Sequence, residues 1–184
     1  MTTFQHAEEL DISAAADAFN IQQIPPETLP AKISAAANAY EDVLKQQELI
    51  LDAYLNLGFL YWQSTEFGFH ASIGLDLGFV KFAEERYPQI LQAVEHNFPE
   101  NPEVQFWKLY FGFVMGDPPF VDRCKMLVGR PGCSLVPFFF LYSQADGHHY
   151  GDEAMKLLEQ CQKVPTLKNC YIKSVIDGVK ARQT

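Results

Sequence analysis

The chain is 184 residues long; 48% of its residues are hydrophobic and 20% are charged. Fourteen basic residues against twenty-three acidic ones give a net charge of −9 at pH 7, which argues against nucleic acid or an anionic membrane as a partner, because both attract basic proteins. The high apolar content excludes a chain disordered along its whole length, so we expect an acidic globular protein whose core needs neither disulfide nor metal.

The start of the chain lacks a basic segment followed by an apolar run, so it is not typical of a secretory signal. No window reaches the ~18 consecutive apolar residues of a membrane helix, and the sequence therefore predicts a cytoplasmic protein. The four cysteines contain no Cys-x-x-Cys pair, the spacing that zinc and redox sites favour. We expect reduced, buried thiols at Cys124, Cys133, Cys161 and Cys170.

The first part of the chain is predicted to hold an arm and the beginning of one domain. Residues 1–27, which close on a Pro-Pro pair, are expected to form a loosely ordered N-terminal arm. Beyond them, apolar residues recur in steps of three and four from Ile33 to Tyr61. This spacing predicts one long helix or two nearly collinear ones. Residues 28–184 are predicted to form a single all-α domain.

Helical signals continue toward the C-terminus, separated by prolines and glycines. Three glycines make residues 64–78 ambiguous, and Pro88 is expected to break or restart the helix that follows. Asn101 and Pro102 open a helix that is apolar on most sides, and such helices belong in the interior. Shorter helices follow, the last of them capped by Thr166. Because no period-two alternation long enough for a strand appears, the predicted fold class is all-α.

Several of these helices carry a recurring order of bulky and small residues. The residues are Tyr54, Leu57, Gly58 and Tyr61, then Phe79 and Phe82 before Pro88; Trp107, Tyr110, Phe111 and Val114, with Arg123 in place of a small residue; and Phe138, Leu141, Tyr142, Ala145, Ala154, Leu158, Cys161 and Pro165. This order resembles the tetratricopeptide repeat from about Tyr54 to Pro165, in a form that is degenerate in two units of three.

The resemblance implies antiparallel helical hairpins stacked as a short, repeat-like solenoid, with a groove for a peptide. A compact helical bundle, whose aromatic spacing imitates the repeat, is the alternative. Both architectures are all-α, so the spacing of the residues leaves the choice between them open.

Aromatic side chains are abundant, with fifteen Phe, eight Tyr and two Trp. Filling of the core is one explanation. Consecutive rings such as Phe138, Phe139 and Phe140 point in different directions on a helix, so some of them should reach a second surface that another helix or a partner covers. Tyr and Trp are favoured at protein interfaces. The candidate partner-binding residues are Trp62, Trp107, Tyr110, Phe113, Phe139 and Tyr142.

One short segment gathers residues of the types that bind metals. Asp146, His148, His149 and Asp152 lie within seven residues, and imidazoles and carboxylates bind zinc or harder divalent ions. Adjacent histidines point apart, however, and a closed site usually takes ligands from elsewhere in the chain. A solvated turn explains the same residues, and we expect no cofactor.

The chain lacks the motifs of nucleophilic, phosphate-binding, dinucleotide-binding and zinc-protease sites. The sequence therefore favours a non-catalytic protein–protein interaction module, an adaptor or scaffold, whose aromatic-rich surface binds a protein, a peptide or a second copy of the chain. One alternative is a small acidic neutralising protein, similar to an antitoxin or an immunity protein, that masks a basic partner. Another is a metal-dependent enzyme that uses His148 and His149.

Overall fold

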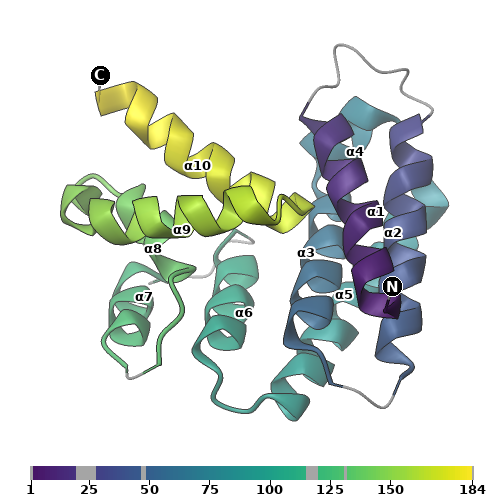
Figure 1. The fold of residues 1–184 in the computed structure, drawn as a ribbon, viewed down its shortest axis with the longest axis horizontal. Helices are drawn as coiled ribbons and strands as arrows, with labels where there is room; N and C mark the ends of the chain where they lie inside the picture. Colours follow the sequence, from purple (N-terminus) through teal and green to yellow (C-terminus); the bar gives the residue numbers. More distant parts are fainter. Residues whose placement is uncertain (1, 20–27, 47–48, 115–119, 131, 184) are drawn as a thin grey trace. The chain divides into compact units, whose positions relative to one another are not determined.

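The computed structural model describes residues 2–19, 28–46, 49–114, 120–130 and 132–183, and these ranges contain helices and no strand (Figure 1). The chain divides into two compact units, residues 1–97 with 165–168, and residues 98–164 with 169–184. The first unit holds α1 (Thr3–Ala18), α2 (Thr28–Leu44), α3 (Leu51–Thr65), α4 (Phe67–Ile73) and α5 (Leu77–Asn97). The second holds α6 (Pro102–Val114), α7 (Phe120–Val128), α8 (Pro137–Tyr142), a 3₁₀ helix (Gly147–Tyr150), α9 (Gly151–Lys163) and most of α10 (Leu167–Gln183).

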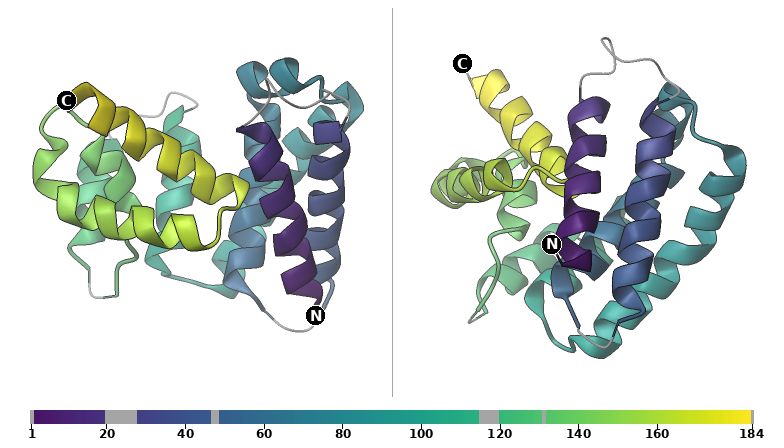
Figure 2. Two further views of the ribbon diagram at one scale, coloured as in Figure 1. Left: turned by 45° about the horizontal axis from the view of Figure 1, so that its top comes forward. Right: turned by 45° about the vertical axis from the view of Figure 1, so that its right-hand side comes forward.

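The N-terminal segment is a packed helix. Thr2 begins α1 with a capping box, in which its hydroxyl accepts from the Gln5 N–H and its own N–H donates to the Gln5 side chain. Helix α1 then lies along α2, and Figure 2 shows the two side by side in both views. Ala7 and Ala14 are fully buried in this contact, since small side chains let the helices approach closely. The sequence predicted a loosely ordered arm over residues 1–27; in the structure residues 3–18 form α1, and 20–27 lie outside the described residues.

Much of the apolar stripe from Ile33 to Tyr61 is buried, at Ile33, Ala37, Tyr40, Tyr54 and Tyr61 among its described residues, but the chain does not run straight along it. Helix α2 ends at Leu44 and α3 begins at Leu51, and the two helices pack against each other. The single or collinear helix of the sequence prediction is therefore wrong. Apolar residues at steps of three and four indicate which side of a helix is buried. They do not indicate whether the chain continues straight or reverses, so the same spacing can run through two helices of opposite direction.

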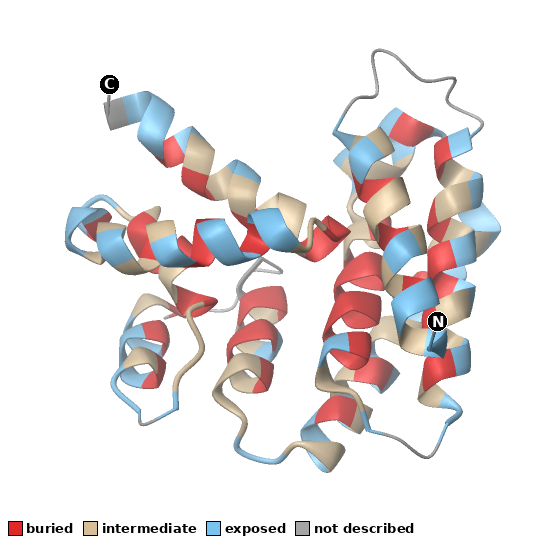
Figure 3. Ribbon diagram, in the orientation of Figure 1, coloured by how far each residue is buried: buried red, intermediate tan, exposed pale blue. Residues whose placement is uncertain are grey.

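Helix α3 forms the centre of the first unit. Eleven of its fifteen residues are buried, and Figure 3 shows the helix buried along almost its whole length. It packs against α2, α4 and α5, so it has no solvent-facing side that would need polar residues. On α5 only Ala83, Ile90 and Val94 are buried. Much of α5 therefore faces away from α3.

The ambiguous segment after α3 resolves into the short helix α4 and a tight turn. Gly74 has a φ of 68°, a left-handed conformation that suits glycine, and Asp76 then caps α5 by accepting from the Phe79 N–H. Pro88 lies inside α5 and does not end it. Buried Ala83 and Ile90 hold the two halves of α5 on the core, which explains why the expected break is absent.

The second unit is built around aromatic rings. Asn101 caps α6 as expected, its side-chain oxygen accepting from the N–H groups of Glu103 and Val104. Gly147, between α8 and α9, is buried so close to the carbonyl groups of Leu141 and Tyr142 that no Cβ would fit.

The division of the chain into two units differs from the single domain predicted for residues 28–184.

Candidate functional site

The residues predicted to bind a partner are mostly buried. Trp62 is 3% exposed in the first unit; in the second unit the exposed fractions are 1% for Trp107, 5% for Tyr110, 0% for Phe139 and 6% for Tyr142. The side chain of Phe113 lies outside the described part of the structure. These five described side chains supply the two cores, so an exposed apolar surface must be carried by other residues.

The aromatic core of the second unit consists of rings from helices α6, α7, α8 and α10. Phe139 contacts Trp107 and Tyr110, with ring centroids 6.0 and 5.4 Å apart. Phe120 and Phe140 pack edge to face at 4.5 Å. These tilted and edge-to-face pairs are the arrangements that aromatic rings prefer in protein interiors. In this unit the aromatic side chains therefore fill the core, which is the first of the two explanations given for their abundance.

The histidine-rich segment lies on the surface. His148 and His149 are exposed residues of the 3₁₀ helix, and their rings lie 5.6 Å apart at nearly a right angle. Asp146 precedes this helix, and Asp152 is exposed in the first turn of α9. Within the described ranges, no three His, Cys, Asp or Glu side chains gather as metal ligands.

The four cysteines are all in the reduced form. Cys124 and Cys161 are buried, as predicted, and Cys133 and Cys170 are half-buried. Burial raises the pKa of the Cys124 thiol to about 12, and it also raises the pKa of Cys133. Neither Cys124 nor Cys133 is therefore set up as a thiolate nucleophile near neutral pH.

A buried carboxylate on α1 binds Leu167, the first residue of α10, which belongs with residues 165–168 to the first unit. Asp11 is fully buried on α1; its Oδ1 accepts from the Leu167 N–H at 2.9 Å and its Oδ2 accepts from the Tyr40 hydroxyl at 3.0 Å. Asn56 donates to the same hydroxyl at 3.1 Å. Burial raises the pKa of Asp11 to about 6, against the lowering effect of these hydrogen bonds and of Lys168. This carboxylate holds the N-terminus of α10 within the first unit.

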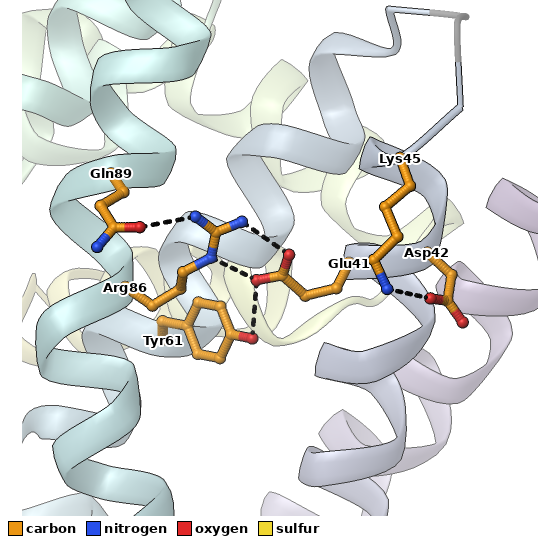
Figure 4. Close-up of polar contacts among 6 residues, drawn as sticks. All are labelled: Glu41, Asp42, Lys45, Tyr61, Arg86 and Gln89. Atoms are coloured by element: carbon orange, nitrogen blue, oxygen red, sulfur yellow. Dashed lines mark hydrogen bonds and ion pairs between the residues drawn. The ribbon is translucent and has the colours of Figure 1, made fainter.

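A second polar cluster joins α2, α3 and α5 (Figure 4). The Arg86 guanidinium donates to both carboxylate oxygens of Glu41, at 2.7 and 2.8 Å, and to the side-chain oxygen of Gln89. The Tyr61 hydroxyl donates to Glu41 as well. Burial alone would raise the pKa of Glu41, but its bonds and charge interaction with Arg86 outweigh burial and lower it. This bidentate ion pair therefore links α5 to α2.

The two most exposed large apolar side chains among the described residues lie at the start of α4 and the start of α5. Phe67 is 79% exposed and Leu77 is 71% exposed. One side of α5 carries residues at steps of three and four, namely Leu77, Val80, Glu84 and Tyr87. Of these, Val80 and Tyr87 are half-buried. We call the surface formed by Glu66, Phe67, Leu77, Val80, Glu84 and Tyr87 the α4–α5 face.

The two acidic residues of the α4–α5 face act on the same side chain. Burial raises the pKa of Tyr87, and the carboxylates of Glu84 and Glu66 raise it further. Phe82 lies on the other side of α5, where its ring contacts Tyr61 at 5.7 Å.

Phe67 and Leu77 were missed in the search for binding residues. Both lie in the glycine-rich segment 64–78, which the sequence left ambiguous. The sequence prediction relied on runs of aromatic residues, and the described members of those runs are mostly buried, in the long helices α3 and α6 and in the short helix α8 alike. No protein-family model, curated protein or solved structure matches this chain. Among the described helices, none combines the length and apolar character needed to cross a bilayer.

Proposed function

We propose that this protein is a non-catalytic protein–protein interaction module that docks a partner on the α4–α5 face. The observation that carries the proposal is the exposure of Phe67 and Leu77, at 79% and 71%, on two helices that follow one another in the chain. Exposed apolar groups that lie together and are rimmed by polar residues are typical of interaction sites. Glu66 and Glu84 provide such a rim.

Site-specific photo-crosslinking tests this proposal. A benzophenone amino acid is placed at position 67, and a matched version carries it at Met126, which is 67% exposed in the second unit. We expect one defined crosslinked product between position 67 and a partner protein. Excess wild-type protein should compete for the partner and suppress this product, whereas excess F67S/L77S variant should not. Equal labelling from both positions, or adducts that both competitors suppress alike, would show that the face is not a docking site.

The acidic neutralising protein is a second candidate, favoured by the distribution of charge. The first unit contains fourteen acidic and five basic residues, whereas the second contains nine of each. The whole net charge of −9 therefore belongs to the first unit. Neutralisation by the field of a whole unit would make association rates fall steeply with added salt and leave them insensitive to F67S/L77S. Docking on the α4–α5 face would give the opposite dependence.

The repeat-like arrangement of the hairpins also stays a proposal. In its favour, α8 and α9 pack together, and Ala154, Leu158 and Cys161 are buried at the second-helix positions of the resemblance. Helix α3 differs, because it packs extensively on α5, from which α4 separates it in the sequence. Stacked hairpins are therefore best supported for the segment from α8 to α9, and a compact bundle for the first unit.

A further inference from the structure

We propose that residues 165–168, at the start of α10, form a latch on the first unit that a proton on Asp11 closes. The neutral carboxyl group keeps this segment seated, and loss of the proton lets it open while the rest of the first unit stays folded. The latch is independent of the α4–α5 face, because it uses none of the residues of that face.

The latch is a short and buried part of the first unit. Residues 165–168 belong to this unit, whereas the chain on either side of them belongs to the second. Thr166, Leu167 and Lys168 are all buried. The Leu167 N–H donates to Asp11 Oδ1 at 2.9 Å, across 156 residues of chain. The latch can open without breaking a backbone hydrogen bond of α1 to α5, because helical hydrogen bonds join residues of the same helix.

Asp11 lies at one end of a buried chain of hydrogen bonds. Tyr40 on α2 donates to Asp11 Oδ2 at 3.0 Å, and Asn56 on α3 donates to the Tyr40 hydroxyl at 3.1 Å. In this direction the side-chain oxygen of Asn56 is buried and receives no hydrogen bond from the described atoms. A buried polar group without a hydrogen-bond partner destabilises the folded state. The arrangement with an ionised Asp11 therefore leaves one buried acceptor unsatisfied.

A proton on Asp11 reverses this chain of hydrogen bonds. The neutral carboxyl group donates to the Tyr40 oxygen, and the Tyr40 hydroxyl then donates to Asn56, whose amide turns over to present its oxygen. The other oxygen of the Asp11 carboxyl group still accepts from the Leu167 N–H. The proton thus supplies the donor that Asn56 lacks and keeps the hydrogen bond that seats the latch.

The charged groups around Asp11 act in both directions. Glu8, one helical turn earlier on α1, disfavours its ionised form, and Lys168 in the latch favours that form. Asp52 on α3 acts in turn on Glu8. Burial raises the pKa of Tyr40, so this hydroxyl stays neutral. At Asp11 burial outweighs the opposing effects and raises the pKa from 3.8 to about 6. Because opening exposes the carboxyl group and restores its ordinary pKa, the closed form is lost as the pH rises through 6.

Hydrogen–deuterium exchange of single amides, followed by NMR in the full chain, tests the latch. The Leu167 amide reports on it directly, since its N–H donates to Asp11. The amides of Leu57 and Leu60, buried in the middle of α3, report on the whole unit. We expect Leu167 to be less protected than these two amides. After correction for the intrinsic pH dependence of exchange, its protection should fall about tenfold between pH 5 and pH 7.5, as a pKa of about 6 closed and 3.8 open requires.

D11N and a matched control assign the effect to one carboxyl group. The amide of D11N keeps an oxygen for the Leu167 N–H and an N–H for the Tyr40 oxygen, so it resembles neutral Asp11 and does not titrate. In D11N the protection of Leu167 should therefore stay constant over the same pH range. E9Q removes an exposed acid from the same helix and should show the decline of the wild type.

Three results would overturn the latch. Protection of Leu167 equal to that of Leu57 and Leu60 would mean that the segment leaves only when the whole unit unfolds. Constant protection of Leu167 in the wild type would mean that no proton controls the segment. A decline as large in D11N as in the wild type would assign the control to groups other than Asp11.

Discussion

The two units use similar aromatic and charged residues in different ways. In the second unit, Trp107 and Phe139 are buried among other rings, and acidic and basic residues are balanced. In the first unit, one carboxylate is fully buried, at Asp11, a second is half-buried, at Glu41, and Phe67 is left exposed. The comparison indicates that stability of the second unit rests mainly on ring packing, whereas the first unit combines apolar packing with charge and carries the proposed docking surface.

Each unit contains one of the chain's two tryptophans, so the comparison can be tested unit by unit. With Trp62 replaced by Phe, fluorescence of Trp107 reports on the second unit. With Trp107 replaced by Phe, fluorescence of Trp62 reports on the first. Urea unfolding in these two backgrounds gives a separate free energy of unfolding for each unit, provided that each transition is two-state.

The largest expected effect is that of removing a ring from the second unit. Phe139 is 0% exposed and contacts Phe106, Trp107 and Tyr110. F139A should lower the free energy of unfolding of this unit by about 4 kcal/mol, because the lost burial leaves a cavity. Urea unfolding in the W62F background measures it. A loss below about 1 kcal/mol, typical of a surface change, would contradict the ring-packing account.

The next effect concerns pH and Asp11. Its pKa is raised in the folded state, from 3.8 to about 6, so its contribution to stability is greatest below pH 3.8 and is lost as the pH rises through 6. The shift corresponds to roughly 3 kcal/mol. Unfolding of the first unit, followed through Trp62 between pH 4 and 7, should show this decline, and D11N should remove it. An unchanged decline in D11N would assign it to other groups.

A smaller effect of opposite sign is expected at Glu41. Because its pKa is lowered in the folded state, its contribution to stability is present above its ordinary pKa of 4.5 and is lost as the pH falls. E41Q should lower the free energy of unfolding of the first unit by about 2 kcal/mol at pH 7, since Arg86 loses a partly buried partner. E85Q, at an exposed position, is the control. Equal stability of the two variants would remove Glu41 from the account.

The smallest effect on stability is expected on the α4–α5 face. F67S and L77S change side chains that are 79% and 71% exposed, so together they should alter the free energy of unfolding by less than about 0.5 kcal/mol. Urea unfolding through Trp62 checks this, and circular dichroism confirms that helix content is kept. A large destabilisation would mean that these side chains serve the fold and not a partner.

Much of the local structure was predictable, and the candidate site was not. Asn101 and Pro102 begin α6, and Leu167 begins α10 directly after Thr166, because caps and prolines act through neighbouring backbone groups. Exposure is different, since it depends on what packs on a residue from elsewhere in the chain. Trp107 and Phe67 are both bulky aromatic residues of helices, yet one is 1% exposed and the other 79%.

The sequence by itself determined that the chain is helical, where helices such as α6 and α10 begin, and which residues form the apolar sides of several helices. These properties follow from hydrogen bonds and side-chain spacing within a few residues. Only the tertiary structure decided that the chain reverses between α2 and α3, and that Asp11 accepts from Leu167, 156 residues away. Such contacts depend on how separate helices bury one another, and no short stretch of residues encodes that.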